Sequence, residues 1–153
     1  MKQSPRLNQI QENMQPGAFT AHGFLGDDSR ALKDIMRQDD AEVEKLGLSH
    51  AQIAGRMQYF TEKGKELLDI PVPVDEDYEV LVDDHRGEIP CPFADNQKAI
   101  KTNTRFTNKK LGITIYWSDL NIHMIRYHGF YEGKGSFFRN DPGKLARALG
   151  LIR

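Results

Sequence analysis

Hydrophobic residues recur at helical spacing in two neighbouring segments of the N-terminal half. The segment 28–47 carries one apolar stripe, formed by Leu32, Ile35, Met36, Val43 and Leu46. The segment 49–68 opens with Ser49 and Gln52, which have the spacing of a capping box, and it carries a second stripe. The pattern therefore predicts two antiparallel helices joined by a tight turn at Gly47, after a short first helix that begins at Ser4 and Pro5.

Asp39 is a polar residue within the first of these stripes, between Met36 and Val43. A buried carboxylate needs a hydrogen-bonding or charged partner. One interpretation is that the helix breaks at Asp39 and Asp40, or leaves Asp39 partly exposed. The other is that Asp39 meets a cation, a histidine or a backbone N–H from elsewhere in the chain. We favour the first interpretation from the sequence.

The pattern changes to strict alternation after the proline-containing segment "DIPVPVDED", which is predicted to be a linker. Apolar and polar residues alternate in the segments 78–83, 100–106 and 113–117, as in half-buried strands. "HRG" at 85–87 is predicted to be a turn, and "EIPCPF" a short strand or extended edge limited by its prolines. These segments predict an antiparallel meander of three to four strands.

Two C-terminal helices follow the meander. Ser118 is suited to cap a helix that runs to about His128, where Gly129 provides a left-handed end, and Pro142 begins a last short helix. Trp117 shares a strand face with apolar neighbours and is expected to be buried. The sequence thus predicts a single α+β domain over residues 1–153. Its helical part, at about 1–69, packs on the sheet, and the sheet and the C-terminal helices together occupy about 76–153.

Composition adds few constraints to this architecture. The 153 residues suit one domain, 39% of them are hydrophobic, and no apolar run approaches the ~20 residues that cross a bilayer. The N-terminal segment is too polar for the core of a signal peptide, and Cys91 is the only cysteine, so no intrachain disulfide can form. These features favour a cytoplasmic protein with no membrane partner.

Charge is distributed unevenly along the chain. Residues 1–95 contain 10 Lys and Arg against 19 Asp and Glu, whereas residues 96–153 contain 11 against 3. A basic segment rich in aromatic residues can bind an anionic small molecule or nucleic acid, or it can face the acidic half within one fold. The candidate ligand-binding residues lie in the loop "EGKGSFFR" and on the adjoining sheet face: Lys134, Ser136, Arg139, Lys101 and Arg105.

A metal site is the second candidate. "LNIHMIRYH" resembles the helical half of a two-Cys two-His zinc finger, with His123 and His128 at a suitable spacing, Cys91 as a third ligand and His85 as a fourth. A finger needs a close pair of cysteines, which this chain lacks. On a straight helix the two histidines also project about 140° apart. The alternative interpretation is that both histidines make ordinary hydrogen bonds, and zinc remains a candidate cofactor.

Cys91 is also a candidate nucleophile, because His85 lies six residues before it. A catalytic cysteine needs a base and an electropositive setting, whereas the acidic residues near Cys91 disfavour a thiolate. A small buried thiol is the preferred interpretation, and no catalytic residue is assigned.

The stretch from "RGEIPCPF" through "WSDLNIHMIRYHGFYEGKGSFFRNDP" resembles sequences of small bacterial cytosolic proteins that have no assigned activity. The resemblance covers the second half of the chain and implies no activity, cofactor or catalytic residue. The sequence therefore favours a non-catalytic cytosolic domain that binds an anionic ligand or partner through its basic C-terminal part. The alternative is a metal-dependent or cysteine-based enzyme that uses His85, Cys91, His123 and His128. The oligomeric state is left open.

Overall fold

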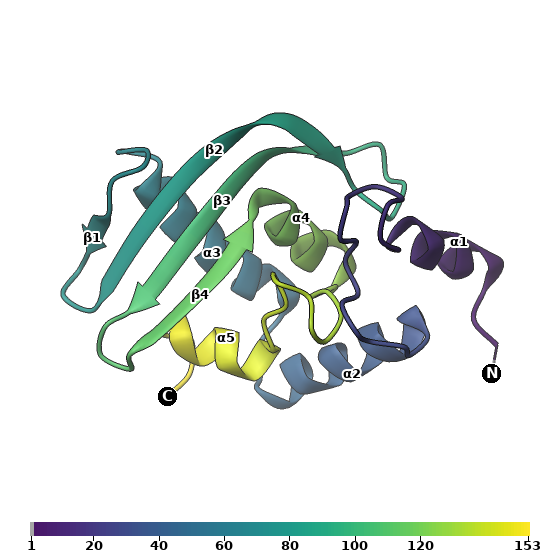
Figure 1. Cartoon of the computed structure of the whole chain (residues 1–153). Helices are drawn as coiled ribbons and strands as arrows, with labels where there is room; N and C mark the ends of the chain where they lie inside the picture. Colours follow the sequence, from purple (N-terminus) through teal and green to yellow (C-terminus); the bar gives the residue numbers. More distant parts are fainter. Residues whose placement is uncertain (1) are drawn as a thin grey trace.

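The computed structural model describes residues 2–153 and confirms the predicted α+β fold class. Three helices come first, a four-stranded sheet occupies the middle of the chain, and two helices follow it (Figure 1). The elements are α1 (Pro5–Asn13), α2 (Leu32–Lys45), α3 (His50–Gly64), β1 (Val72–Val74), β2 (Tyr78–Pro90), β3 (Lys98–Asn108), β4 (Ile113–Ser118), α4 (Asp119–His128) and α5 (Pro142–Ala148).

The sheet is an antiparallel meander in the order β1-β2-β3-β4, and it arches over α3 and α4 (Figure 1). Two local predictions are wrong. "HRG" is not a turn between strands, because β2 continues through it with a shift of register between His85 and Glu88. The segment "DIPVPVDED" is not only a linker, because Val72–Val74 pairs with the start of β2 as a short edge strand. Proline at position 73 is tolerated there, since an edge strand need not donate on its outer side.

The main core lies between α3, α4 and the concave face of the sheet. Trp117 is fully buried, as predicted, and its indole N–H donates to Thr61 Oγ1 at 2.8 Å. Thr61 in turn shares a hydrogen bond with Thr104 of β3, so that every buried hydroxyl in this group has a partner. The capping box of Ser49 and Gln52 forms as predicted and begins α3.

A second apolar cluster joins α1, α2, the loop after β2 and one side of α4. It includes Met14, Leu32, Cys91, Phe93 and Met124, all buried. Asn13 of α1 donates from its side chain to the carbonyl of residue 92, which attaches this loop to the first helix. The loop that carries Cys91 is therefore packed into this cluster and hydrogen-bonded to α1.

The prediction that α2 breaks at Asp39, or exposes it, is wrong. The helix is continuous, and Asp39 is buried against Arg139, whose Nη1 and Nη2 donate to the two carboxylate oxygens at 2.5 and 2.9 Å. The other interpretation, a cation supplied from elsewhere in the chain, holds. Because Arg139 is 100 residues away, no local sequence signal identifies it as the partner.

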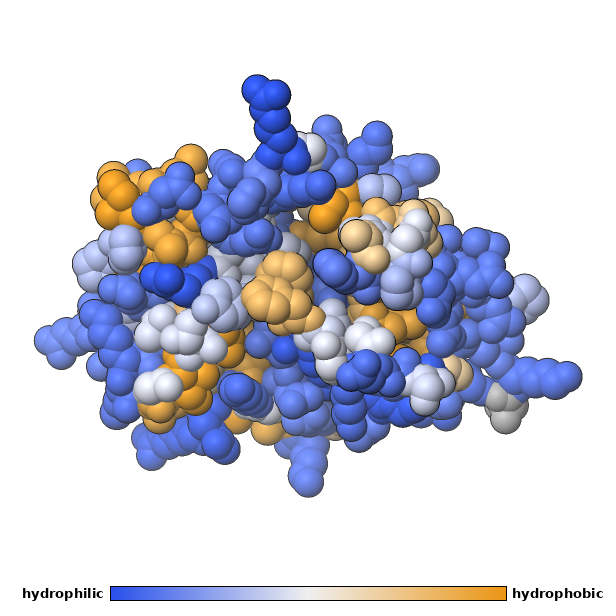
Figure 2. Space-filling model, in the orientation of Figure 1, coloured by the Kyte–Doolittle hydropathy of each residue, from blue (hydrophilic) through white to orange (hydrophobic). Residues whose placement is uncertain are grey.

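The surface in the orientation of Figure 1 is mostly polar, with apolar side chains gathered near its middle and at one end (Figure 2). Within residues 2–153, no helix has both the length and the apolar character needed to cross a membrane.

Candidate metal centre

The loop between β2 and β3 carries Cys91 and Asp95, and hydrogen bonds within the loop hold it in a compact conformation. The backbone N–H of Cys91 donates to the carbonyl of Gln97 at 2.9 Å, and the N–H of Gln97 donates to Asp95 Oδ1 at 3.0 Å. Ala94 and Asn96, on either side of Asp95, both have positive φ angles, of 57° and 63°. Non-glycine residues rarely adopt such angles, and the strain tends to occur at functional sites.

Helix α4 presents His123 and His128 to the same loop. The helix begins with a capping box formed by Ser118 and Asn121 and ends at Gly129, which has φ 62° as predicted. The ring of Phe93 stacks on that of His128, with centroids 4.1 Å apart and an interplanar angle of 4°. This stacking fixes the orientation of the histidine ring at the last turn of the helix.

The two histidines converge on one carboxylate oxygen. His123 Nε2 lies 2.7 Å and His128 Nε2 lies 2.8 Å from Asp95 Oδ2. The argument that they diverge on a straight helix is wrong, because Asp95 lies between the two rings and both lean towards it without any unwinding of α4. Including the thiol of Cys91, one ligand atom from each of the four residues lies within 4.8 Å of the other three.

Burial and the neighbouring groups have opposite effects on the pKa of Asp95, whereas burial and the nearby charge both raise the pKa of Cys91. Burial of Asp95 raises its pKa, but hydrogen bonds from His128 and His123 outweigh this and hold the pKa well below its ordinary value. Burial raises the pKa of the Cys91 thiol to about 12, and the nearby Asp95 adds to this rise. Without a metal the thiol is therefore protonated and a poor nucleophile, whereas a bound transition metal would deprotonate it.

The cluster matches the predicted metal ligands at three of four positions. Cys91, His123 and His128 come together, but His85 lies elsewhere, 3.0 Å from Asp83 on β2. Asp95 takes the fourth position, and sequence reasoning missed it by treating its charge only as an argument against a thiolate. Its position four residues after Cys91, next to asparagine in "CPFADN", was the available signal of a turn that returns a carboxylate towards the thiol.

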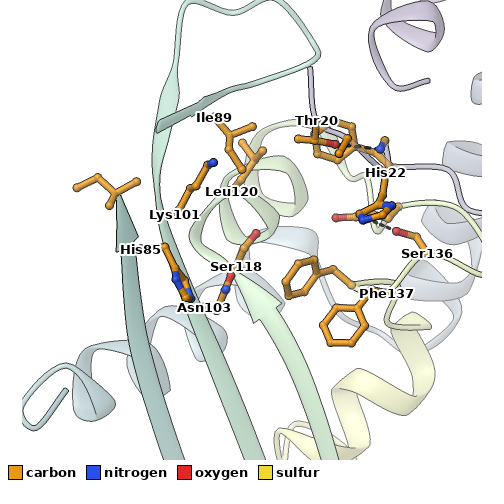
Figure 3. Close-up of a pocket in the computed structure, with 16 residues that line it drawn as sticks. Thr20, His22, His85, Ile89, Lys101, Asn103, Ser118, Leu120, Ser136 and Phe137 are labelled. Atoms are coloured by element: carbon orange, nitrogen blue, oxygen red, sulfur yellow. Dashed lines mark hydrogen bonds between the residues drawn. The ribbon is translucent and has the colours of Figure 1, made fainter. Parts of the chain in front are cut away.

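The predicted anion-binding residues do not form one site. The guanidinium of Arg139, a candidate ligand-binding residue, is paired with Asp39 and Asp141 within the fold. The hydroxyl of Ser136 donates to Glu132, and Lys134 is exposed. Lys101 and Ser136 line a common cavity (Figure 3), but Arg105 is not among its lining residues.

Comparisons with known proteins add nothing to this geometry. No protein family matches the chain, and no curated protein or solved structure is significantly similar to it.

Proposed function

We propose that this protein binds one Zn²⁺ ion through Cys91, Asp95, His123 and His128, and that the metal fastens the loop after β2 to the end of α4. The observation that supports the proposal is the convergence of four ligand atoms, from two segments of the chain, within 4.8 Å of one another. Bonds of ~2.0–2.3 Å in a zinc tetrahedron give distances between ligand atoms of roughly 3.3–3.8 Å. The separations in the structure run from 2.7 Å to at most 4.8 Å, so the four side chains would adjust around the ion to reach that geometry.

The ligand types favour zinc over other common ions. One thiolate, two imidazoles and one carboxylate are typical zinc ligands, whereas Mg²⁺ and Ca²⁺ prefer sites built only from oxygen. Two histidines and a carboxylate alone would also suit non-haem iron, which keeps open coordination positions. Here Cys91 supplies a fourth, soft ligand, and a zinc tetrahedron with four protein ligands is closed. The arrangement therefore supports a structural role for the metal rather than the enzymatic alternative.

The experiment that tests this proposal is metal analysis of the purified protein, with single substitutions of the ligands. We expect one zinc per chain in the wild type and loss of the metal in Cys91→Ala and His123→Ala. His85→Ala is the matched control, because His85 lies outside the cluster, and it should keep the zinc. A cobalt-loaded sample reports thiolate coordination directly, since its sulfur-to-metal charge-transfer band should be absent in Cys91→Ser.

Zinc should also stabilise the fold by mass action. At a free concentration of 100 times the dissociation constant, binding adds about 2.7 kcal/mol to the free energy of unfolding. For a chain of this length this corresponds to a rise of ~5–11 °C in Tm, which a chelator should reverse. Absence of metal from the wild type together with no shift on adding zinc would refute the proposal, as would loss of zinc from His85→Ala.

A further inference from the structure

A separate cavity of about 390 Å³ opens where the arched ends of β2 and β3 meet the start of α4 and the loops 20–24 and 132–138 (Figure 3). None of the four residues of the metal centre lines it. Its volume lies in the usual range for small-molecule sites. Most of its lining surface is apolar, contributed by Phe24, Ile89, Ile100, Leu120, Phe137 and Phe138.

The rim of the cavity exposes large apolar side chains. Phe137 is 73% exposed and Ile100 is 60% exposed, and each lines the cavity from a different segment. The ring of Phe137 contacts those of Tyr116 and Phe138, with centroids 5.5 and 4.9 Å away, so neighbouring aromatic rings hold it in place. Exposed apolar side chains that gather around a hollow are typical of binding sites.

The interior wall carries one carboxyl group, that of Glu132, which is 3% exposed and has φ 66°. Asn121 and Ser136 donate to its two oxygens, and Arg139 Nη1 donates to its backbone carbonyl at 3.0 Å. Burial raises the pKa of Glu132 to about 7, against the hydrogen bonds from Ser136 and Asn121 and the charge of Arg139. Because both oxygens already accept hydrogen bonds, this group is poorly placed to bind a ligand cation.

The free charge at the cavity is positive. Within residues 2–153, no carboxylate lies within ion-pair distance of Lys101, whose side chain lies beside Ile89 and Leu120 in Figure 3. His22 also lines the cavity and has no acidic partner in the described chain, whereas His85 Nε2 lies 3.0 Å from Asp83 Oδ1. A cation without a partner beside apolar walls is complementary to an anion with an apolar body.

We propose that this cavity binds a small organic acid with an aromatic or branched apolar body, whose carboxylate pairs with Lys101 and whose body lies against Leu120 and Phe137. The hydroxyl oxygen of Ser136, whose proton is donated to Glu132, accepts a hydrogen bond from a polar group at the far end of the ligand. The specificity comes from one charge at the rim and from apolar walls, so phosphate alone, which has no apolar body, gains little.

The experiment is a titration of the zinc-replete protein with phenylacetate and with phenylacetamide, followed by amide chemical shifts in two-dimensional NMR. The two probes share the apolar body and differ in charge. We expect phenylacetate to shift resonances of the cavity residues and to bind about tenfold more tightly than the amide, as a charge-assisted hydrogen bond implies. In Lys101→Gln this preference should disappear. In Lys109→Gln, an exposed lysine just after β3, it should persist.

The proposal is overturned if phenylacetate shifts no cavity resonance, if the amide binds as tightly as the acid, or if Lys101→Gln keeps the full preference. Benzylamine and inorganic phosphate serve as further probes. Tighter binding of either than of phenylacetate also overturns it, because the amine would identify Glu132 as the recognition group and phosphate would show that charge alone suffices. Lys101 is exposed, so its substitution is not expected to impair folding.

Discussion

Glu132 shows at the scale of one residue that a buried acid can work against the fold. A carboxyl group with a raised pKa binds its proton more tightly in the folded state than in the unfolded state. Its contribution to stability is therefore fully present below the unfolded pKa of 4.5 and is lost as the pH rises to about 7. The buried carboxyl group of Glu132 therefore lowers the stability of the protein at neutral pH.

We expect Glu132→Gln to remove this pH dependence. Between about pH 4.5 and about pH 7.5, the wild type should lose up to about 3 kcal/mol of unfolding free energy relative to the variant. Urea unfolding of both proteins across this range measures the difference, and contributions from all other groups cancel in the comparison. Parallel curves for the two proteins would show that Glu132 does not titrate in this window.

At the scale of the elements, helix α3 approaches the sheet closely because its last residue is glycine. A Cβ on Gly64 would overlap the side chains of Val80 and Val82 on β2. Gly55, earlier on the same helix, is exposed, and a Cβ added there would meet no neighbouring atom within 4 Å. An added methyl group would therefore clash with the sheet at Gly64 but would lie in open space at Gly55.

Gly64→Ala should destabilise the protein by ~1–3 kcal/mol, the usual cost of overpacking. Gly55→Ala should instead stabilise it by ~0.5–1 kcal/mol, because alanine restricts the unfolded chain and favours the helix. Chemical denaturation of the two variants gives both values. Equal changes of the same sign would contradict the close packing of α3 on β2.

Most helices and strands could be predicted from local sequence signals. The places where the structure differs from that prediction could not. Residues close together in the sequence form the capping boxes at Ser49 and Ser118 and the alternation in β3. The boundaries of these elements could therefore be predicted. The continuation of β2 through "HRG" depends on its pairing with β3, and the burial of Asp39 depends on Arg139, which lies 100 residues away. The metal centre could likewise be predicted only in part. Cysteine and histidine are uncommon in this chain and were therefore identified as candidates. Asp95 is one acidic residue among many, and only the folded structure shows that it lies beside them.

At the scale of the whole molecule, the acidic and basic halves of the chain meet inside the fold. The pair of Asp39 and Arg139 joins α2 to the loop before α5, and its side chains are only 4% and 9% exposed. Removing one partner of a buried ion pair leaves the other charge without compensation. Part of the positive charge of the C-terminal segment therefore neutralises the N-terminal half.

Arg139→Ala should lower the free energy of unfolding by ~3–5 kcal/mol. Lys134→Ala, in the same loop but exposed, should change it by no more than ~0.5 kcal/mol. Arg139→Lys should restore only part of the loss, since lysine cannot make the two parallel hydrogen bonds. Thermal and urea unfolding measure all three variants, and a cost for Arg139→Ala as small as that for Lys134→Ala would place the pair at the surface.

The shift of register between His85 and Glu88 also makes the outer edge of β2 a poor template for a strand from another molecule. Beyond its short pairing with β1, the outer edge of β2 has no partner strand among the described residues, and an open edge can recruit a strand from another molecule. This edge carries the charged sequence "DDHRGE", and its irregular backbone interrupts the regular array of N–H and C=O groups that an added strand would need. The irregularity that bends β2 therefore also discourages fibril-like growth through this edge.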